Sequence, residues 1–194
     1  MFVMNRLIVA ITGTPGTGKS ELATVLSKKI PGSSILEIND IVNKYKLYSK
    51  KNKFGTKIVD LGRLNKKLSV ELKRKNGTVI IAGHLAQELR FRCDVAVVTR
   101  CGLVKLAERL NKRKYAKEKA AENLVAEATD YCGLKMIGRC RNTYEVETRS
   151  EKSRIMSYIV ALSKGKAAKK PTKRQIDELG DLIKLVKGGN KYGL

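Results

Sequence analysis

The N-terminal part of the chain reads Leu7-Ile8-Val9-Ala10-Ile11-Thr12 and continues as Gly13-Thr14-Pro15-Gly16-Thr17-Gly18-Lys19-Ser20. The first six residues are mostly apolar and β-branched, which favours a buried strand. Beyond the glycines, Leu22, Leu26 and Ile30 recur at helical spacing, and Pro31-Gly32 stops the helix. The order is therefore strand, glycine-rich loop, helix.

The segment between this strand and helix has the pattern Gly-x-x-x-x-Gly-Lys-Ser, which is typical of a phosphate-binding loop. Its glycines let successive backbone N–H groups point inward, and together with the helix N-terminus they form a cradle for the phosphates of ATP. Lys19 would bridge the β- and γ-phosphates, and the Ser20 hydroxyl would bind Mg²⁺. A plain glycine-rich turn is the alternative. The residues predicted to bind ATP in and beside this loop are Gly13, Thr14, Gly16, Thr17, Gly18, Lys19, Ser20 and Glu21, with Ser20 as the metal ligand.

Segments that suit strands alternate with amphipathic segments that suit helices along most of the chain. Strands are expected at Leu7–Thr12, Ser34–Ile38, Thr78–Ala82, Asp94–Thr99 and Thr143–Thr148. Helices are expected after Lys19, from an Asn39-Asp40 cap through Tyr45, from Asp60 to near Asn76, around Leu103–Leu110, from Lys119 to near Tyr131, and over Glu151–Ser163. This alternation predicts an α/β fold of the P-loop NTPase type, with helices on both faces of a five-stranded parallel sheet in three αβα layers.

The length of 194 residues suits one domain with a tail. Residues 1–163 are expected to form the P-loop domain. Residues 164–194 are expected to form a basic linker and a C-terminal helix, which a capping box at Thr172 and Gln175 would open. The lysine-rich segment from Lys44 to Thr56 gives no clear secondary-structure signal.

The charge of the chain is strongly positive, with 41 Lys and Arg residues against 18 Asp and Glu, a net charge of +23. Such an excess indicates an anionic partner, polyphosphate or RNA, bound with strong salt dependence. A lysine-rich proteome or a thermophilic surface is the alternative, although thermophiles usually balance Lys with Glu. The longest apolar runs, Leu7–Ile11 and Val79–Ala82, are too short for a membrane-spanning helix.

The four cysteines, Cys93, Cys101, Cys132 and Cys140, contain no Cys-x-x-Cys pair. They are expected to be free thiols in a reducing cytoplasm, which also predicts a cytoplasmic location. A zinc site of four thiolates is the alternative, although the tight ligand spacing that is usual for such sites is missing.

The phosphate-binding loop alone does not fix the reaction, because switch GTPases, motor ATPases and small-molecule kinases share it. A GTPase would carry a base-reading segment such as Asn-Lys-x-Asp after a strand. The fourth expected strand ends instead in Thr99-Arg100-Cys101. The sequence therefore disfavours a switch GTPase.

Further motifs accompany the loop. They are Asn39-Asp40, Tyr45 with Leu47-Tyr48, Val59-Asp60, Val79-Ile80-Ile81-Ala82-Gly83-His84, Val98-Thr99-Arg100, Glu108-Arg109-Leu110, Arg113-Lys114-Tyr115, Lys119, Glu122-Asn123 and Glu127. With this set the chain resembles the nucleoside-monophosphate kinases over roughly Leu7–Ser163 and, among them, the adenylate kinase 6 family of ribosome assembly. The resemblance implies an adenylate-kinase-like phosphotransferase that converts ATP and AMP to two ADP, hydrolyses ATP, and assists maturation of the small ribosomal subunit.

The resemblance also implies a layout for the site. ATP would lie on the loop, a short lid would lie near Lys112–Glu122, and a nucleoside-monophosphate pocket would extend from about Leu36 to Val59. Arg113 matches the lid arginine over ATP, and Arg109 is a second candidate, although both could be solvated bases on a helix face. His84, at a strand end where ligands gather, would orient the attacking water or a magnesium-bound water, with a structural role as the alternative. The implied catalytic residues are Lys19, His84 and Arg113.

One position departs from the family pattern. Many of these kinases have an Asp two residues before the histidine, and here that position is Ala82. Mg²⁺ would then depend on Ser20, phosphate oxygens and water, with Asp40 as a nearby candidate. The missing carboxylate predicts a slow ATPase or a weak kinase.

The resemblance finally implies partners: AMP as acceptor, a small-subunit ribosomal protein, and ribosomal RNA or a precursor of the small subunit. No membrane partner is expected, and the chain would be a monomer or a heterodimer with the ribosomal protein. RNA contact is expected at Lys44–Lys57 and at the basic C-terminal end. A metabolic nucleoside-monophosphate kinase without a ribosomal role, and a non-catalytic RNA-binding module, are the alternatives.

Overall fold

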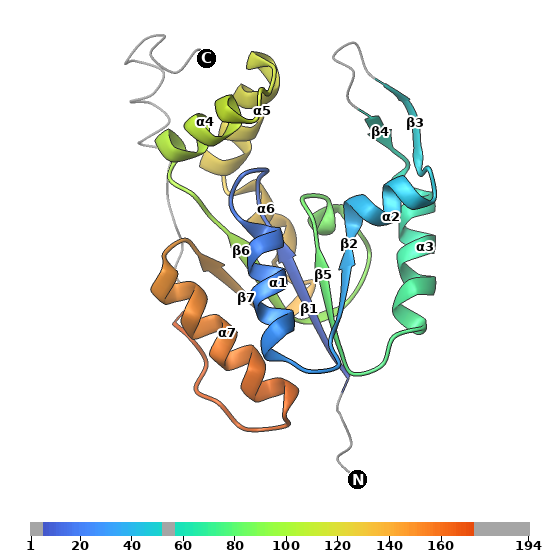
Figure 1. Cartoon of the computed structure of the whole chain (residues 1–194), viewed down its shortest axis with the longest axis vertical. Coiled ribbons are helices and arrows are strands. Elements are labelled where there is room, and N and C mark those ends of the chain that lie inside the picture. Colours follow the sequence, from blue (N-terminus) through green and yellow to red (C-terminus); the bar gives the residue numbers. More distant parts are fainter. Residues whose placement is uncertain (1–5, 52–56, 173–194) are drawn as a thin grey trace.

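The computed structural model describes residues 6–51 and 57–172 (Figure 1). Its main sheet has five parallel strands in the order β2-β5-β1-β6-β7. These strands are β1 (Leu7–Thr12), β2 (Ser34–Glu37), β5 (Thr78–Ala82), β6 (Cys93–Thr99) and β7 (Cys140–Val146). The predicted α/β P-loop NTPase fold is confirmed.

Helices cover both faces of the main sheet, as Figure 1 shows. They are α1 (Lys19–Lys29), α2 (Ile38–Lys44), α3 (Leu61–Lys73), α4 (Leu103–Lys112), α5 (Lys117–Ala128), α6 (Tyr131–Met136) and α7 (Arg149–Ser163), with a 3₁₀ turn, η1, at Ala86–Glu88. Side chains of α1 and α7 share one core cluster with the sheet, whereas α3 and α6 contribute to clusters on its other side. Helices α4 and α5 pack on each other through a separate apolar cluster.

The central strand explains why the opening apolar run is continuous. Val9 and Ile11 belong to the cluster shared with α1 and α7, and Ala10 between them belongs to the cluster shared with α6. All three side chains are fully buried. A strand that is covered on both faces has no position for a polar residue, which is typical of parallel sheets.

The lysine-rich segment without a clear signal contributes one strand to a small antiparallel ribbon, and the second strand follows the segment. It consists of β3 (Tyr48–Lys51) and β4 (Lys57–Val59), with Tyr48 opposite Val59. Lysine and asparagine are depleted in strands, so the composition of this segment did not predict the strand pairing. In Figure 1 the ribbon projects beyond α2 and α3 at the upper end of the molecule.

The main differences from the expected element boundaries concern α2, the end of α5 and the start of β7. Helix α2 begins at Ile38, so the Asn39-Asp40 pair lies in its first turn and does not cap it. The expected helix up to Tyr131 breaks at Asp130, whose φ of 50° is left-handed, and α6 follows as a separate helix. Strand β7 begins at Cys140 and not at Thr143, because its ladder with β6 already starts at Cys93.

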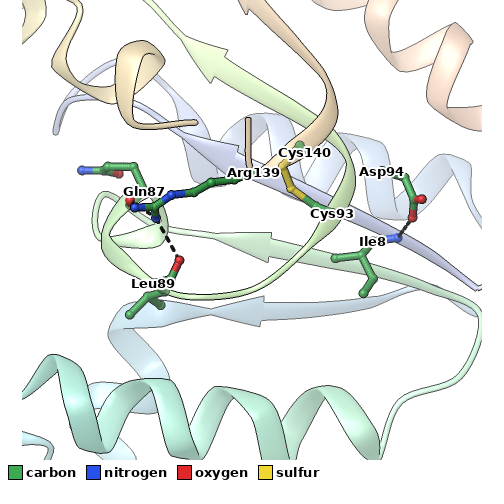
Figure 2. The surroundings of a disulfide bond; sticks show 7 residues. All are labelled: Ile8, Gln87, Leu89, Cys93, Asp94, Arg139 and Cys140. Atoms are coloured by element: carbon green, nitrogen blue, oxygen red, sulfur yellow. Dashed lines mark hydrogen bonds between the residues drawn. A yellow bond between two sulfur atoms is a disulfide. The ribbon is translucent and has the colours of Figure 1, made fainter. Parts of the chain in front are cut away.

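The two cysteines at this ladder's start form a disulfide, so the expectation of four free thiols was wrong for this pair (Figure 2). Cys93 and Cys140 are register partners on neighbouring strands, and their Cα atoms lie 4.5 Å apart, within the range that a disulfide spans. Cys101 and Cys132 are free and buried. Among the described residues no group of three or more His, Cys, Asp or Glu residues could hold a metal ion, so the zinc alternative finds no support.

Helix α7 ends at Ser163, where the P-loop domain was expected to end. The expected helix beyond Thr172 lies outside the described residues, so the division at residue 163 stays a prediction. No helix in the described part of the chain is long and apolar enough to span a bilayer.

Candidate active site

A cavity of about 860 Å³ lies at the carboxyl ends of the central strands. The phosphate-binding loop contributes Gly16, Gly18, Lys19, Ser20 and Glu21 to its lining. The segment after β5 contributes His84, and Arg113 lines the cavity from the end of α4. Seven of the residues predicted from the sequence therefore meet in one place, at the edge where parallel sheets bind ligands.

The predicted loop residues that do not line the cavity stabilise the loop through buried contacts. The Thr17 hydroxyl donates to the carbonyl of Thr14 at 2.8 Å and shares a hydrogen bond of 2.6 Å with the hydroxyl of Thr99. Gly13 has a φ of 139°, and a Cβ there would lie 2.4 Å from the carbonyl oxygen of Thr99. Only glycine fits so close to the neighbouring strand. These buried contacts fix the shape of the loop before any ligand binds.

Lys19 is the central cation of the cavity. Its ammonium donates to the carbonyl of Thr14 at 2.9 Å. Burial lowers its pKa to about 8, the charge of Arg113 adds to this, and the carboxylates of Glu127 and Glu37 offset it in part. A buried ammonium is stabilised by a nearby anion. The residues present therefore fit a polyphosphate, as ATP would supply.

Glu37 is a site residue that the sequence analysis missed. It is the last residue of β2, and it lines the cavity together with Ser20. Burial raises its pKa, and the charge of Asp40 adds to the effect, while the neighbouring Ser20 side chain and the charge of Lys19 lower it. The available signal was its place near the carboxyl end of an expected strand and just before an expected helix, where ligand-binding residues collect.

His84 stands directly after β5 and faces the same cavity. Burial lowers its pKa to about 4, and the positive charges of Lys19 and Lys119 add to this. The imidazole is therefore neutral near pH 7. The preceding Gly83 lets α2 approach, because a Cβ there would lie 2.7 Å from Cβ of Ile38.

The two predicted arginines occupy different places. Arg109 of α4 donates from Nη1 to the carbonyl of Gly16 at 2.7 Å, so it ties the loop to the lid helix and does not line the cavity. Arg113 follows the last residue of α4 and lines the cavity together with Tyr115 and Lys119. The lid region expected near Lys112–Glu122 thus contributes cations directly above the loop.

A buried charge network surrounds Arg100, the residue that follows β6. The Arg100 guanidinium pairs with Glu127 of α5 at 3.0 Å, with Asp130 at 2.8 Å and with Glu145 of β7 at 2.9 Å. Only 2% of Arg100 is exposed. The sequence indicated Arg100 and Glu127 only as parts of a family motif, and the structure shows them joined in an ion pair.

The wall opposite the lid comes from the segment expected to bind a monophosphate. Glu37, Asn39 and Val59 line the cavity within that segment, and Leu61 and Leu85 extend it. A cavity of this size lies in the upper part of the range of about 300–1,000 Å³ typical of ligand sites.

Comparison with known proteins finds a matching family model and archaeal relatives. A family model described as an AAA domain matches residues 9–130. A protein of Methanocaldococcus jannaschii named "Putative adenylate kinase" is 34% identical over 164 residues, which cover 84% of this chain and 89% of the relative. A protein of the same name from Thermococcus kodakarensis is 32% identical over 143 residues, covering 73% of this chain and 76% of the relative.

Solved structures with the same fold include shikimate kinase from Acinetobacter baumannii in complex with shikimate. It has a TM-score of 0.55 at 12% identity, covering 82% of this chain and 93% of that chain. Deoxyadenosine kinase from M. mycoides has a TM-score of 0.51 at 16% identity, covering 79% of this chain and 98% of that chain. At these sequence identities, the similarity shows a shared fold and no more.

Proposed function

The chain belongs to the AAA domain family and to the family of archaeal proteins that bear the name adenylate kinase, and from this premise we propose that it transfers the γ-phosphoryl group of ATP to AMP, giving two ADP. Without an acceptor, water would take the phosphoryl group. The observation that carries the proposal is the half-buried Lys19 ammonium, which lines the same cavity as Arg113 and Glu37.

The site supplies what phosphoryl transfer requires, namely positioning and neutralisation of charge. The backbone N–H groups of the loop and Lys19 would hold the β- and γ-phosphates, while Arg113 would bring a second cation from the lid. The Ser20 hydroxyl would be a ligand of Mg²⁺, which supplies further neutralising charge when bound. Neutral His84 would orient the acceptor oxygen by hydrogen bonding rather than by charge.

Purified protein supplied with ATP and each nucleoside monophosphate in turn tests the reaction. We expect ADP formation above the ATP-only rate with AMP, and a smaller or no increase with CMP, GMP and UMP. Equal slow release of ADP with and without every monophosphate would leave ATP hydrolysis as the reaction. Absence of nucleotide binding would contradict the proposal altogether.

His84→Ala is expected to lower kcat by about 10²-fold while the affinity for ATP changes less than about threefold, because His84 would act on the reacting oxygen and not on the bound triphosphate. The pKa of about 4 predicts that His84 contributes no inflection to the rate between pH 6 and 7. Steady-state rates across this pH range, with nucleotide affinity from calorimetry, check both points. Equal losses in rate and affinity would indicate a structural role.

We also propose that the protein assists small ribosomal subunit maturation, in contact with ribosomal RNA and a ribosomal protein. The net charge of +23 supports this, as does the resemblance to the adenylate kinase 6 family. A second hollow, of about 840 Å³, is lined by Arg90, Arg92, Arg139 and Arg141. It lies at the amino ends of β6 and β7, opposite the ATP cavity. A metabolic kinase without a ribosomal role is the alternative.

In this arginine hollow, Arg139 donates to the carbonyls of Gln87 and Leu89, which fixes its place (Figure 2). Arg90 and Arg92 are exposed. Replacing both by Glu is expected to weaken binding of structured RNA about tenfold near 0.1 M salt and to flatten the salt dependence, because phosphate contacts release counterions. Filter binding at several salt concentrations measures this.

The charge-matched control is Lys28→Glu with Lys29→Glu, at the exposed end of α1. It makes the same change in net charge away from the hollow and is expected to change affinity less than about threefold. Equal weakening by both double variants would show that RNA responds to overall charge alone. Unchanged kinase activity without any RNA affinity would favour the metabolic alternative.

A further inference from the structure

Strand β5 ends without an acidic residue beside the phosphate-binding loop. Its last residue is Ala82, fully buried and followed by Gly83 and His84. No carboxylate on this strand can therefore approach Ser20. Phosphoryl transfer still needs a place for the cation that accompanies the triphosphate.

The neighbouring strand places a carboxylate at the same level. Strands β2 and β5 are parallel, and Glu37 is the register partner of Ala82. The acidic side chain that β5 lacks at this level is therefore present on the neighbouring strand, at the end of β2. The pairing is long-range and arises only when the sheet forms.

Glu37 faces the same cavity as the loop. Lys19, Ser20 and Glu37 all line this cavity, and the Ser20 side chain and the charge of Lys19 both stabilise the Glu37 carboxylate. Asp40, in the first turn of α2, is exposed and is absent from the cavity lining among the described residues. Of the two acidic residues, the structure therefore favours Glu37 over Asp40 as the one that serves the loop.

The chemistry suits a hydrated cation better than an acceptor phosphate. Mg²⁺ keeps several of its waters in such sites and is bound through one or two carboxylates together with phosphate oxygens. A carboxylate that accepts hydrogen bonds matches those waters. It would repel the phosphate of AMP, because two anions at close range disfavour each other.

We propose that Glu37 replaces the missing carboxylate of β5 and, with the Ser20 hydroxyl, holds the hydrated Mg²⁺ that accompanies ATP. The proposal rests on the proposed function, because it requires the triphosphate to lie on the loop. It makes Glu37 a residue whose effect on nucleotide binding depends on the metal.

Calorimetric titration of the full chain with the β,γ-imido analogue of ATP, with Mg²⁺ and with EDTA, tests this. The quantity of interest is the ratio of the two association constants. Glu37→Gln is expected to lower this ratio at least tenfold, while affinity in EDTA is unchanged or higher because a negative charge near the phosphates is removed. Asp40→Asn, the matched control, is expected to leave the ratio within about twofold of the wild-type value.

The possible outcomes separate the two proposals. No binding of the analogue to the wild-type protein would contradict the proposed function. Binding that depends on Mg²⁺ to the same extent in wild type and Glu37→Gln would overturn the role of Glu37 alone. If Glu37→Gln weakened binding of the analogue equally with and without Mg²⁺, Glu37 would act on the shape of the loop. If Asp40→Asn lowered the ratio of association constants as much as Glu37→Gln does, the effect would come from diffuse negative charge. Either result would also overturn the inference.

Discussion

Lys19→Ala is expected to lower ATP turnover by at least about 10³-fold and to leave the fold intact. The loss is large because a preorganised cation in a buried site stabilises charge that develops in the transition state. The fold should persist because the ammonium donates to the carbonyl of Thr14, which belongs to the same loop. Coupled measurement of ADP release gives the rate, and circular dichroism verifies the fold. Turnover at the wild-type rate would show that the phosphate site is assigned wrongly.

The stability of the same site provides a control that does not depend on activity. Lys19 has a pKa of about 8 in the folded chain against an ordinary value of 10.5, so folding disfavours its charged form. This penalty is fully present below pH 8 and disappears as the pH rises from 8 to 10.5, where the unfolded chain binds more protons. Lys19→Met removes the charge. At pH 7 this variant should therefore have a higher melting temperature than the wild-type protein, and the difference between the two melting temperatures should shrink toward pH 10.

Arg100→Met is expected to lower the free energy of unfolding by about 3–5 kcal/mol, because it leaves buried carboxylates without their cation. Burial opposes the charge of Arg100, yet Glu127, Asp130 and Glu145 together raise its pKa above the ordinary value. One guanidinium therefore connects the end of β6 with α5, with Asp130 and with β7. Urea unfolding followed by circular dichroism measures the change.

The matched control for this variant is Arg141→Met. The side chain of Arg141 is 83% exposed and lies 3.7 Å from Asp94. An exposed ion pair contributes between zero and about 1 kcal/mol, so this variant should unfold near the wild-type midpoint. A loss below about 1 kcal/mol for Arg100→Met would show that the buried network does not hold the lid region.

The residues near the loop could be predicted because local sequence determines them. An apolar run, a glycine pattern and a helical period lie within residues 7–30, and they fix strand, cradle and helix without distant contacts. The same reasoning located β5, β6 and the Asp60 cap of α3, whose carboxylate accepts from the backbone N–H of Arg63 as a capping residue does.

The residues that were missed depend on contacts that a single segment does not carry. The place of Glu37 beside Ala82 comes from the β2–β5 register, and the Cys93–Cys140 disulfide comes from the β6–β7 register. The break before α6 depends on Asp130, whose carboxylate pairs with Arg100. Sequence spacing does not encode these pairings, which explains why the sequence analysis named Asp40 and missed Glu37.

A crystal structure of the protein with the β,γ-imido analogue of ATP and Mg²⁺ is the most direct test of the site. The account predicts that the triphosphate lies within hydrogen-bonding distance of the backbone N–H groups between Gly13 and Ser20, with the Lys19 ammonium on its β- and γ-phosphates. A triphosphate bound elsewhere, with the loop still holding the Lys19 ammonium on the carbonyl of Thr14, would contradict it.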